Sequence, residues 1–324
     1  MRSVAVAQRG KGPRPTSKRR SGRPGGRPVG RPQKATARDW IGGARLRTLT
    51  LGVVPVVLGT AVAYVDGGYD LGIALLCLAV ALFLQIGVNY SNDYSDGVRG
   101  TDRYRVGPAR LTGSGRARPR TVLTVALTFF GLAAVAGVVI VVLTGLWWLL
   151  AVGAAAILAA WFYTGGKRPY GYNALGEVFV FVFFGLVAVL GTEFVQIHHV
   201  TLNAWAAAVA AGLFACAVLM VNNIRDIDED RLAGKRTLAV VLGSRAARTL
   251  YVLFLVLPYV VLVWFVVLYF RTGYTYFTLL LALPAAIIGA TSNRPRELIT
   301  ALQLSSFSAL AYGIVLGIAL ALQP

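Results

Sequence analysis

The sequence predicts an all-α, polytopic membrane protein with about nine transmembrane helices around a central cavity that opens near the cytoplasmic side. Hydrophobic residues make up 56% of its 324 residues and charged residues only 14%, whereas a typical soluble domain carries about 25% charged residues. The mean hydropathy of +0.66 points to the same class. Helices are the expected spanning form, because the apolar stretches lack the strict alternation of barrel strands.

The chain begins with a basic segment, residues 1–38, which contains twelve Lys or Arg and no acidic residue. The segment is rich in Gly, Pro and Ser and has almost nothing to bury, so we expect a disordered cytoplasmic tail. Such a tail would lie near anionic lipid, where each cation is worth about 1 kcal/mol. An arm in the DNA minor groove, an organelle transit peptide and a misassigned start codon are alternatives. Because the rest of the chain is membrane-embedded, no nucleic-acid partner is expected.

Residues 39–324 are expected to form one nine-helix domain, because apolar runs long enough to span a bilayer, or nearly so, recur along them. The predicted spans are 48–65, 71–92, 121–143, 146–163, 174–192, 203–223, 249–269, 275–291 and 299–322. The two cysteines, Cys77 and Cys216, fall within these spans without the spacing of a metal site. We therefore expect them to be small buried hydrophobic residues.

The positions of the basic residues set the expected orientation. With the N-terminal tail inside, Arg271 is the one Lys or Arg that falls in an outside loop. This distribution follows the positive-inside rule. The loops after the second, fourth, sixth and eighth spans are therefore expected to be cytoplasmic.

Polar side chains close the second predicted span, in the stretch QIGVNYSNDYSDGVRGTD at 85–102. Four of them share one face of a helix, because they are spaced four, three and four residues apart. These four are Gln85, Asn89, Asn92 and Asp96, and Asp93 adjoins them. Ionisable residues within a membrane span are costly and indicate a functional site.

A second polar cluster closes the sixth predicted span, in NNIRDIDEDRLAGKRTL at 222–238. Asn222, Asp226 and Asp230 are spaced four and four residues apart and again share one helix face. The second and sixth spans end on the same side of the membrane. Two helices are therefore expected to present amides and carboxylates at the same depth.

Carboxylates gathered in this way repel one another unless a cation lies between them. Mg²⁺ fits this role, because it prefers oxygen ligands and is commonly held by one or two carboxylates plus substrate phosphates. The loops beside the carboxylates supply the basic residues Arg110, Lys167, Arg168, Arg225, Lys235 and Arg236. The pattern predicts a metal-bridged diphosphate site, with apolar helices behind it for a lipid tail. Solvated ion pairs and a transporter are alternatives, although a transporter places its polar residues near the midplane.

Four motifs carry a resemblance to a known family. NDYSD with a following GTD, YTGGKRPYGYNALGE, NNIRDID and GKRTL occur in this order along the chain. Together they resemble the UbiA-type intramembrane prenyltransferases over residues 40–322. Within these, the pattern is similar to the branch that prenylates 1,4-dihydroxy-2-naphthoate in menaquinone biosynthesis. The resemblance implies a multi-pass protein of the bacterial cell membrane.

The resemblance also implies roles for residues at matching positions. The Mg²⁺ ligands would be Asp93, Asp96, Asp226 and Asp230. The substrate-binding residues at these positions would be Gln85, Asn89, Asn92, Tyr163, Lys167, Arg225, Lys235 and Arg236. Apart from the resemblance, Tyr94, Arg110, Asn222 and Asn223 are also expected to bind substrate.

The chain departs from the family pattern in two places. The common spacing puts a third aspartate at position 100, where Gly100 stands, and Asp102 comes two residues later. Either Asp96 or Asp102 is expected to take a proton from the acceptor. The family's R-P-x-T motif reads RLRT at 45–48, so either Arg45 or Arg47 could be the functional arginine.

The implied reaction is Mg²⁺-dependent transfer of a polyprenyl group from an allylic polyprenyl diphosphate to 1,4-dihydroxy-2-naphthoate. Diphosphate and CO₂ would leave, and demethylmenaquinol would form. Apolar walls would shield the allylic cation from water, and aromatic faces would stabilise it. Other acceptors used within the superfamily, such as 4-hydroxybenzoate, are alternatives.

Overall fold

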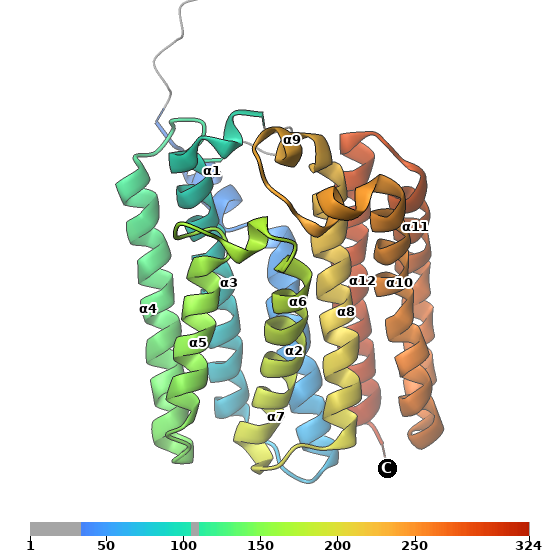
Figure 1. The fold of residues 1–324 in the computed structure, drawn as a ribbon. Helices are drawn as coiled ribbons and strands as arrows, with labels where there is room; N and C mark the ends of the chain where they lie inside the picture. The colour runs from blue at the N-terminus through green and yellow to red at the C-terminus, as the bar shows by residue number, and fades with distance from the viewer. Residues whose placement is uncertain (1–33, 105–109, 324) are drawn as a thin grey trace, which may run out of the picture. The chain divides into compact units, whose positions relative to one another are not determined.

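The computed structural model describes residues 34–104 and 110–323, and these residues form a helical bundle without a β-strand (Figure 1). The prediction of an all-α, polytopic membrane protein is confirmed. Eight helical segments within the described ranges are long and apolar enough to cross a membrane, and α5 is a shorter apolar helix. The predicted tail lies outside the described residues up to position 33. Residues 34–38 of the predicted tail are described and belong to the bundle, since Ala35 N–H donates to the Arg116 carbonyl.

The membrane-spanning elements follow one another along the chain with few insertions. They are α2 (Leu46–Val65), α3 (Leu71–Arg99), α4 (Pro119–Thr144), α5 (Leu149–Phe162), α6 (Gly176–Val180) continued by the π-helical η3 (Phe181–Val187) and α7 (Ala188–Ile197), α8 (Leu202–Arg225), α10 (Leu238–Leu268), η4 (Phe270–Thr278) with α11 (Leu279–Thr291), and α12 (Pro295–Ala321). Short helices lie between them: α1 (Ala37–Gly43), η1 (Thr101–Tyr104), η2 (Tyr170–Tyr172) and α9 (Ile227–Leu232).

The helix α3 extends further than its apolar run predicts. It continues through the polar stretch to Arg99 and stops at Gly100, whose φ of 76° is in the left-handed region that glycine adopts readily. Asn92, Asp93 and Asp96 therefore lie on the last turns of a helix and keep the helical spacing that places them on neighbouring faces.

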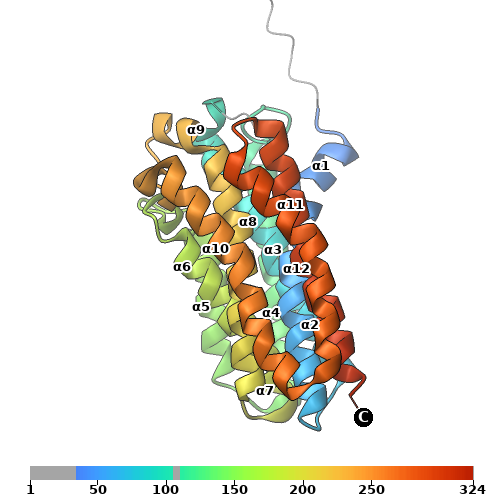
Figure 2. The ribbon, with the colours of Figure 1, turned by 90° about the vertical axis from the view of Figure 1, so that its right-hand side faces the viewer.

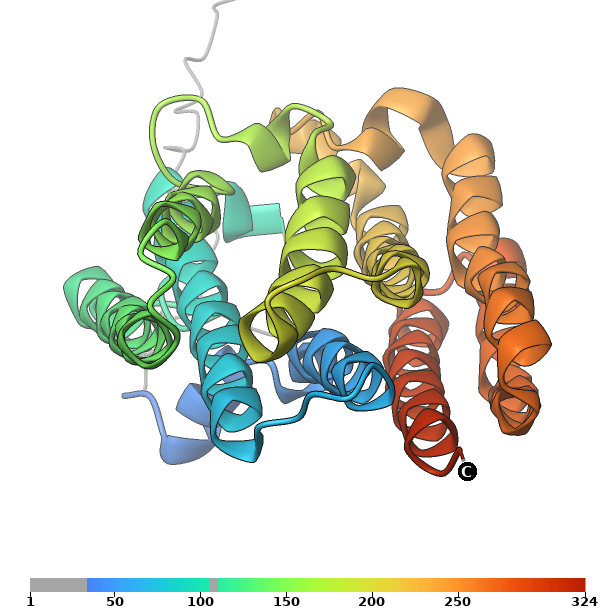
Figure 3. The same cartoon turned by 90° about the horizontal axis from the view of Figure 1, so that it is seen from below.

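The helix α8 is the most deeply buried of the long helices in the described part of the chain. It packs against α10, α12, α2 and η3, and its Ala-rich sequence lets these neighbours approach closely. Figure 3 shows these helices around it, seen along the bundle. The approach of η3 is especially tight, because a Cβ on Gly185 would lie 2.7 Å from the Ala208 carbonyl oxygen.

One end of the bundle collects the short helices and the polar ends of α3 and α8. Figures 1 and 2 show α1 and α9 at this end, and the loop after α5 lies deeper along the bundle than either of them. The bundle thus brings the two polar sequence clusters to the same end.

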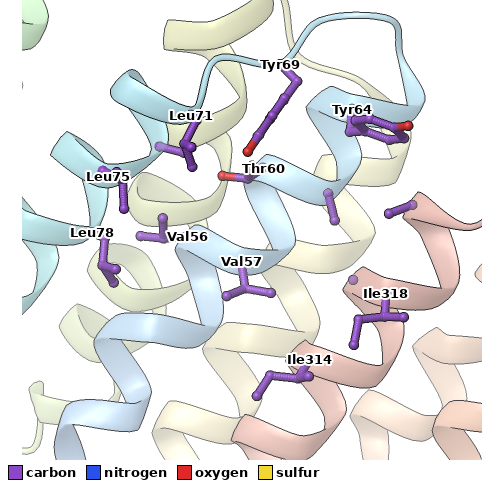
Figure 4. A pocket seen from close by; sticks show the side chains of 14 residues that line it. Val56, Val57, Thr60, Tyr64, Tyr69, Leu71, Leu75, Leu78, Ile314 and Ile318 are labelled. Carbon is purple, nitrogen blue, oxygen red and sulfur yellow. The ribbon is translucent and has the colours of Figure 1, made fainter.

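An apolar groove of about 530 Å³ lies at the opposite end of the bundle, between α2, α3 and α12 (Figure 4). Leu75 and Leu78 of α3 line it with Val57 of α2 and Ile314 of α12. Its lining contains no charged side chain, so it lacks the groups that would bind a diphosphate or a metal. The central cavity expected from the sequence stays a prediction.

Candidate active site

The carboxylate of Asp96 is the centre of the polar cluster at the end of α3. It is only 1% exposed, and groups from three other segments contact it. Its Oδ2 lies 2.6 Å from Arg110 Nη1 and 3.3 Å from Lys235 Nζ, and its Oδ1 accepts a hydrogen bond from the Tyr172 hydroxyl. Since a buried charge is stable only when it is paired, these contacts hold the segments together around Asp96.

Arg110 links Asp96 to the rest of the first cluster. Its Nη1 also donates to the Asn92 carbonyl at 2.8 Å, and its Nε lies 3.4 Å from Asp102 Oδ1. Burial acts to lower the pKa of Arg110, but the carboxylates of Asp96, Asp102 and Asp93 outweigh burial and raise it. The guanidinium is thus charged at every accessible pH, and Asp102 is placed as a partner of Arg110.

Asp93 has a different role from its neighbour Asp96 in this structure. Its Oδ2 accepts the backbone N–H of Leu111 and its Oδ1 that of Thr112, both at 2.8 Å. Both oxygens of this buried carboxylate therefore fix the loop backbone that carries Arg110. They are engaged away from the Asp96 cluster, although the resemblance implied a metal ligand here.

Two cations lie close to the ring of Tyr172, whose hydroxyl donates to Asp96. Lys235 Nζ lies 4.8 Å and the Arg99 guanidinium 5.4 Å from the centre of its ring, within the range of cation–π attraction. Burial and the adjacent Asp96 carboxylate raise the pKa of Tyr172, so its hydroxyl remains a donor at neutral pH. Sequence reasoning missed this residue, although it lies in the YTGGKRPYGYNALGE motif.

The loop after α5 is tied to the end of α3 by two further residues that the sequence analysis did not single out. Arg99 donates to the carbonyls of Thr164 and Gly166, and the Thr164 hydroxyl donates to Asn92 Oδ1 at 2.7 Å. Asn92 therefore anchors the loop. The signal that could have revealed Thr164 is its place beside Tyr163 in the same motif.

The second cluster is held by Arg225. Its Nε and Nη2 contact the two oxygens of Asp226 at 2.6 Å each, and its Nη2 also lies 2.9 Å from Asn222 Oδ1. Lys235 Nζ lies 3.8 Å from Asp230 Oδ1. Because the same ammonium contacts Asp96, Lys235 joins the two clusters.

The predicted metal ligands do not form one carboxylate cluster. In residues 34–104 and 110–323, no three His, Cys, Asp or Glu side chains are grouped as a metal site would need. The chemistry of the donors nevertheless suits Mg²⁺, since only oxygen atoms are offered. Asp96 and Asp230 both contact one ammonium, so a cation already lies between them. Asp226 lies four residues before Asp230 in the sequence, and its carboxylate forms an ion pair with Arg225.

The two deep amides contact the start of α2. Asn89 Nδ2 donates to the Ala44 carbonyl at 2.8 Å, and Gln85 Nε2 lies 3.4 Å from Thr48 Oγ1. Between these points Arg45 adopts a left-handed backbone conformation, with φ of 54°, and its side chain is half-buried. Arg47 is exposed. Of the two arginines left open by the sequence, Arg45 is the more buried and is within electrostatic range of Tyr163.

Three predicted site residues lie apart from the cluster. Lys167 and Arg236 expose their side chains, and Arg236 contributes only its backbone N–H, which donates to the Tyr172 carbonyl at 2.9 Å. Tyr94 packs against the apolar cluster of Tyr90 and Leu111.

Tyr163 and Asn223 lie on the deeper side of the cluster. Tyr163 is within electrostatic range of Asp96, Arg45 and Glu177. Asn223 Nδ2 donates to Glu177 Oε1 at 3.0 Å. Glu177, which lies near the predicted cytoplasmic end of the fifth span, thus belongs to the same region.

The fold and the site define a class, a multi-pass membrane protein with a buried acid–base cluster at one end of its helices. The UbiA prenyltransferase family matches residues 52–297. The chain belongs to this family and is a membrane prenyltransferase, which sets aside the transporter alternative.

Two named relatives share much of the sequence of this chain. The chain is 54% identical over 217 residues to 1,4-dihydroxy-2-naphthoate octaprenyltransferase of Mycobacterium tuberculosis, covering 67% of this chain and 74% of the relative. It is 34% identical over 293 residues to the protein of that name in Haemophilus influenzae, covering 87% and 95%.

Two archaeal structures share the fold. A UbiA homolog from Aeropyrum pernix K1 has a TM-score of 0.62 at 17% identity, covering 83% of this chain and 96% of that one. A UbiA homolog from Archaeoglobus fulgidus, bound to DMAPP and Mg²⁺, has a TM-score of 0.61 at 15% identity, covering 86% and 99%.

Proposed function

We propose that the chain transfers a polyprenyl group from an allylic polyprenyl diphosphate to 1,4-dihydroxy-2-naphthoate, with release of diphosphate and CO₂ and formation of demethylmenaquinol. The main support for this proposal is that the Lys235 ammonium contacts the carboxylates of both Asp96 and Asp230. It joins two carboxylates from distant parts of the chain beside several cations. The names of the relatives support the naphthoate acceptor.

The cations would bind the diphosphate. Lys235 carries its charge on a flexible stem, so its ammonium can turn from the carboxylates to a phosphate oxygen. Arg225 can share its guanidinium between Asp226 and a second phosphate oxygen. These contacts would stabilise the negative charge that grows on the diphosphate as its bond to the prenyl carbon breaks.

Asp96, Asp230 and Asp226 are the residues that would hold Mg²⁺. When bound, the ion would neutralise charge on the leaving diphosphate. The same carboxylates bind cationic side chains in this structure, so Lys235 and Arg225 would have to turn towards the diphosphate when the metal binds.

The prenyl chain would lie among the apolar helices behind the cluster. Burial of the site keeps water from the allylic cation, which would otherwise be hydrolysed. The electron-rich ring of the acceptor would attack this cation at the carbon that bears the carboxylate, and that carboxylate would leave as CO₂. Tyr163, within electrostatic range of Asp96 and Glu177, is a candidate to contact the ring.

The distribution of basic residues supports a cell-membrane protein whose site end faces the cytoplasm. Both substrates carry negative charge at one end and apolar groups at the other. They would reach the site from the cytoplasmic leaflet. The basic residues of the segment predicted as a tail would attract anionic lipid on that side.

The test is an assay of the purified full chain in detergent with Mg²⁺, a polyprenyl diphosphate and one of two acceptors. We expect prenylation and CO₂ release with 1,4-dihydroxy-2-naphthoate, and loss of turnover when EDTA removes Mg²⁺. Prenylation of 4-hydroxybenzoate alone would contradict the acceptor assignment. Full activity in EDTA would contradict the role of the metal.

A further inference from the structure

Glu177 is a buried carboxyl group whose two oxygens are in different situations. The residue lies in α6 and is 4% exposed. Its Oε1 accepts a hydrogen bond from Asn223 Nδ2 at 3.0 Å, whereas its Oε2 is buried and has no hydrogen-bond partner in the described part of the chain. A buried polar atom of this kind costs free energy and calls for an explanation.

The other buried glutamate of the bundle provides a contrast. Glu193 is fully buried at the opposite end of the same span, and its Oε1 and Oε2 both accept hydrogen bonds from Thr201, at 2.6 and 3.1 Å. Both oxygens of this buried carboxylate are therefore paired. At Glu177 one oxygen is left over.

The surroundings of Glu177 are those of the proposed acceptor site. Its hydrogen-bond partner Asn223 lies two residues before Arg225 on α8. A Cβ on the preceding Gly176 would lie 3.8 Å from the Tyr163 hydroxyl. Tyr163 in turn is within electrostatic range of both Glu177 and Asp96. Glu177 is thus adjacent to the charged cluster and on its deeper side.

The carboxylates of the cluster are poorly suited to take a proton. Asp96 is held by two cations, and Asp102 lies beside Arg110, so both carboxylates are already engaged in ion pairs. The contacts of the Glu177 carboxyl group include no cationic side chain among the ion pairs of the described residues. The unpartnered Oε2 can therefore accept a proton from a bound hydroxyl group.

Because Oε2 is the oxygen without a partner, we propose that Glu177 is a catalytic residue whose Oε2 accepts the hydroxyl proton of the aromatic acceptor. As the O–H bond breaks, its electrons enter the ring, and the ring carbon forms a bond to the prenyl carbon while the bond to diphosphate breaks. Loss of CO₂ returns an electron pair to the ring oxygen, which then takes the proton back from Glu177. Atoms and charge balance without a further reactant. This inference rests on the proposed function.

The test compares Glu177→Gln with the matched variant Glu193→Gln in the purified full chain. The glutamine keeps the shape and the acceptor for Asn223 but cannot take a proton. We expect Glu177→Gln to lower kcat by about 10²–10⁴-fold, with the Kd for polyprenyl diphosphate unchanged. Glu193→Gln should stay within about twofold of the wild-type kcat.

Retention of the wild-type kcat by Glu177→Gln would overturn the inference, and so would a loss of donor binding that matches the loss of turnover. If Glu177→Gln does not fold, Glu177→Ala is assayed with added formate. Restored turnover would support a proton acceptor at this position, and a lack of rescue would contradict it. A wild-type chain that fails to prenylate the naphthoate would instead overturn the proposed function.

Discussion

The ammonium of Lys235 lies 3.3 Å from the carboxylate of Asp96, although 139 residues separate them in the sequence. This ion pair joins the end of α3 to the loop before α10. Its position beside Asp230 makes Lys235 the single side chain that contacts carboxylates of both sequence clusters in the described part of the chain.

Replacement of Lys235 by Met should weaken donor binding. Loss of one contact to a charged group is worth about 1.5–3 kcal/mol, which corresponds to about 10- to 150-fold in the Kd for polyprenyl diphosphate. The matched control is Arg236→Met, because this neighbouring side chain is exposed. Titration of both variants with the donor checks the prediction, and equal effects at the two positions would contradict it.

Asp93 and Asp96 should respond differently to removal of their charge. Asp93→Asn should loosen the loop at Leu111 and Thr112, lowering the free energy of unfolding by about 1–3 kcal/mol while the Mg²⁺ requirement stays the same. Asp96→Asn should raise the Mg²⁺ concentration needed for half-maximal turnover. Thermal melting and Mg²⁺ titration separate these effects. A shifted Mg²⁺ requirement in Asp93→Asn would make Asp93 a ligand.

Tyr172→Phe should keep the ring contacts with Arg99 and Lys235 but remove the hydrogen bond to Asp96. We expect kcat/KM to fall about tenfold, the effect of one charge-assisted hydrogen bond. Tyr172→Leu, which also removes the ring, should lose more. If both variants lose the same amount, the hydroxyl alone matters and the cation–π contacts contribute nothing.

The stabilising effect of Tyr172 should depend on pH only in alkaline solution. Its pKa is raised in the folded protein by burial and by Asp96. The contribution of the protonated hydroxyl is therefore fully present below the unfolded pKa of about 10 and is lost as pH rises through the folded value. The difference in melting temperature between wild type and Tyr172→Phe should be constant between about pH 6 and about pH 9. A difference that changes across this range would contradict the assignment.

Arg45 and Arg47 should differ sharply in importance. Arg45→Ala should reduce turnover by at least about tenfold, because the half-buried Arg45 is within electrostatic range of Tyr163 at the polar end of the bundle. Arg47→Ala should have little effect, because that side chain is exposed. Parallel assays of the two variants test this assignment, and a larger loss in Arg47→Ala would reverse it.

The sequence predicted the helical class and the span positions well, because apolar runs of membrane length are a strong signal. It predicted the helix face of Asn89, Asn92 and Asp96 because helical spacing survives in the polar end of α3. It did not predict that Asp93 would bind loop backbone. Adjacent carboxylates look alike in a sequence, and their partners, Leu111 and Thr112, act through backbone groups that any residue possesses.

The contacts of Tyr172, Arg99 and Thr164 also escaped sequence analysis. Each depends on how the loop after α5 folds back over the end of α3, and a loop path is not encoded in periodicity. Tyr94 was expected at the site as an aromatic residue that could stabilise the allylic cation. One step along a helix turns a side chain by about 100°, which directs Tyr94 into the apolar cluster beside Tyr90.

The short helix α5 has a consequence for the depth of the site. Its 14 residues extend about 21 Å, which is less than the hydrocarbon thickness of about 30 Å. Leu158 and Phe162 expose apolar side chains along it, so lipid must meet them. The bilayer would have to thin beside α5, or the loop carrying Thr164 and Tyr172 would sit below the level of the lipid headgroups. In either case the polyprenyl donor can pass its charged end into the protein sideways from the leaflet, without first leaving the membrane.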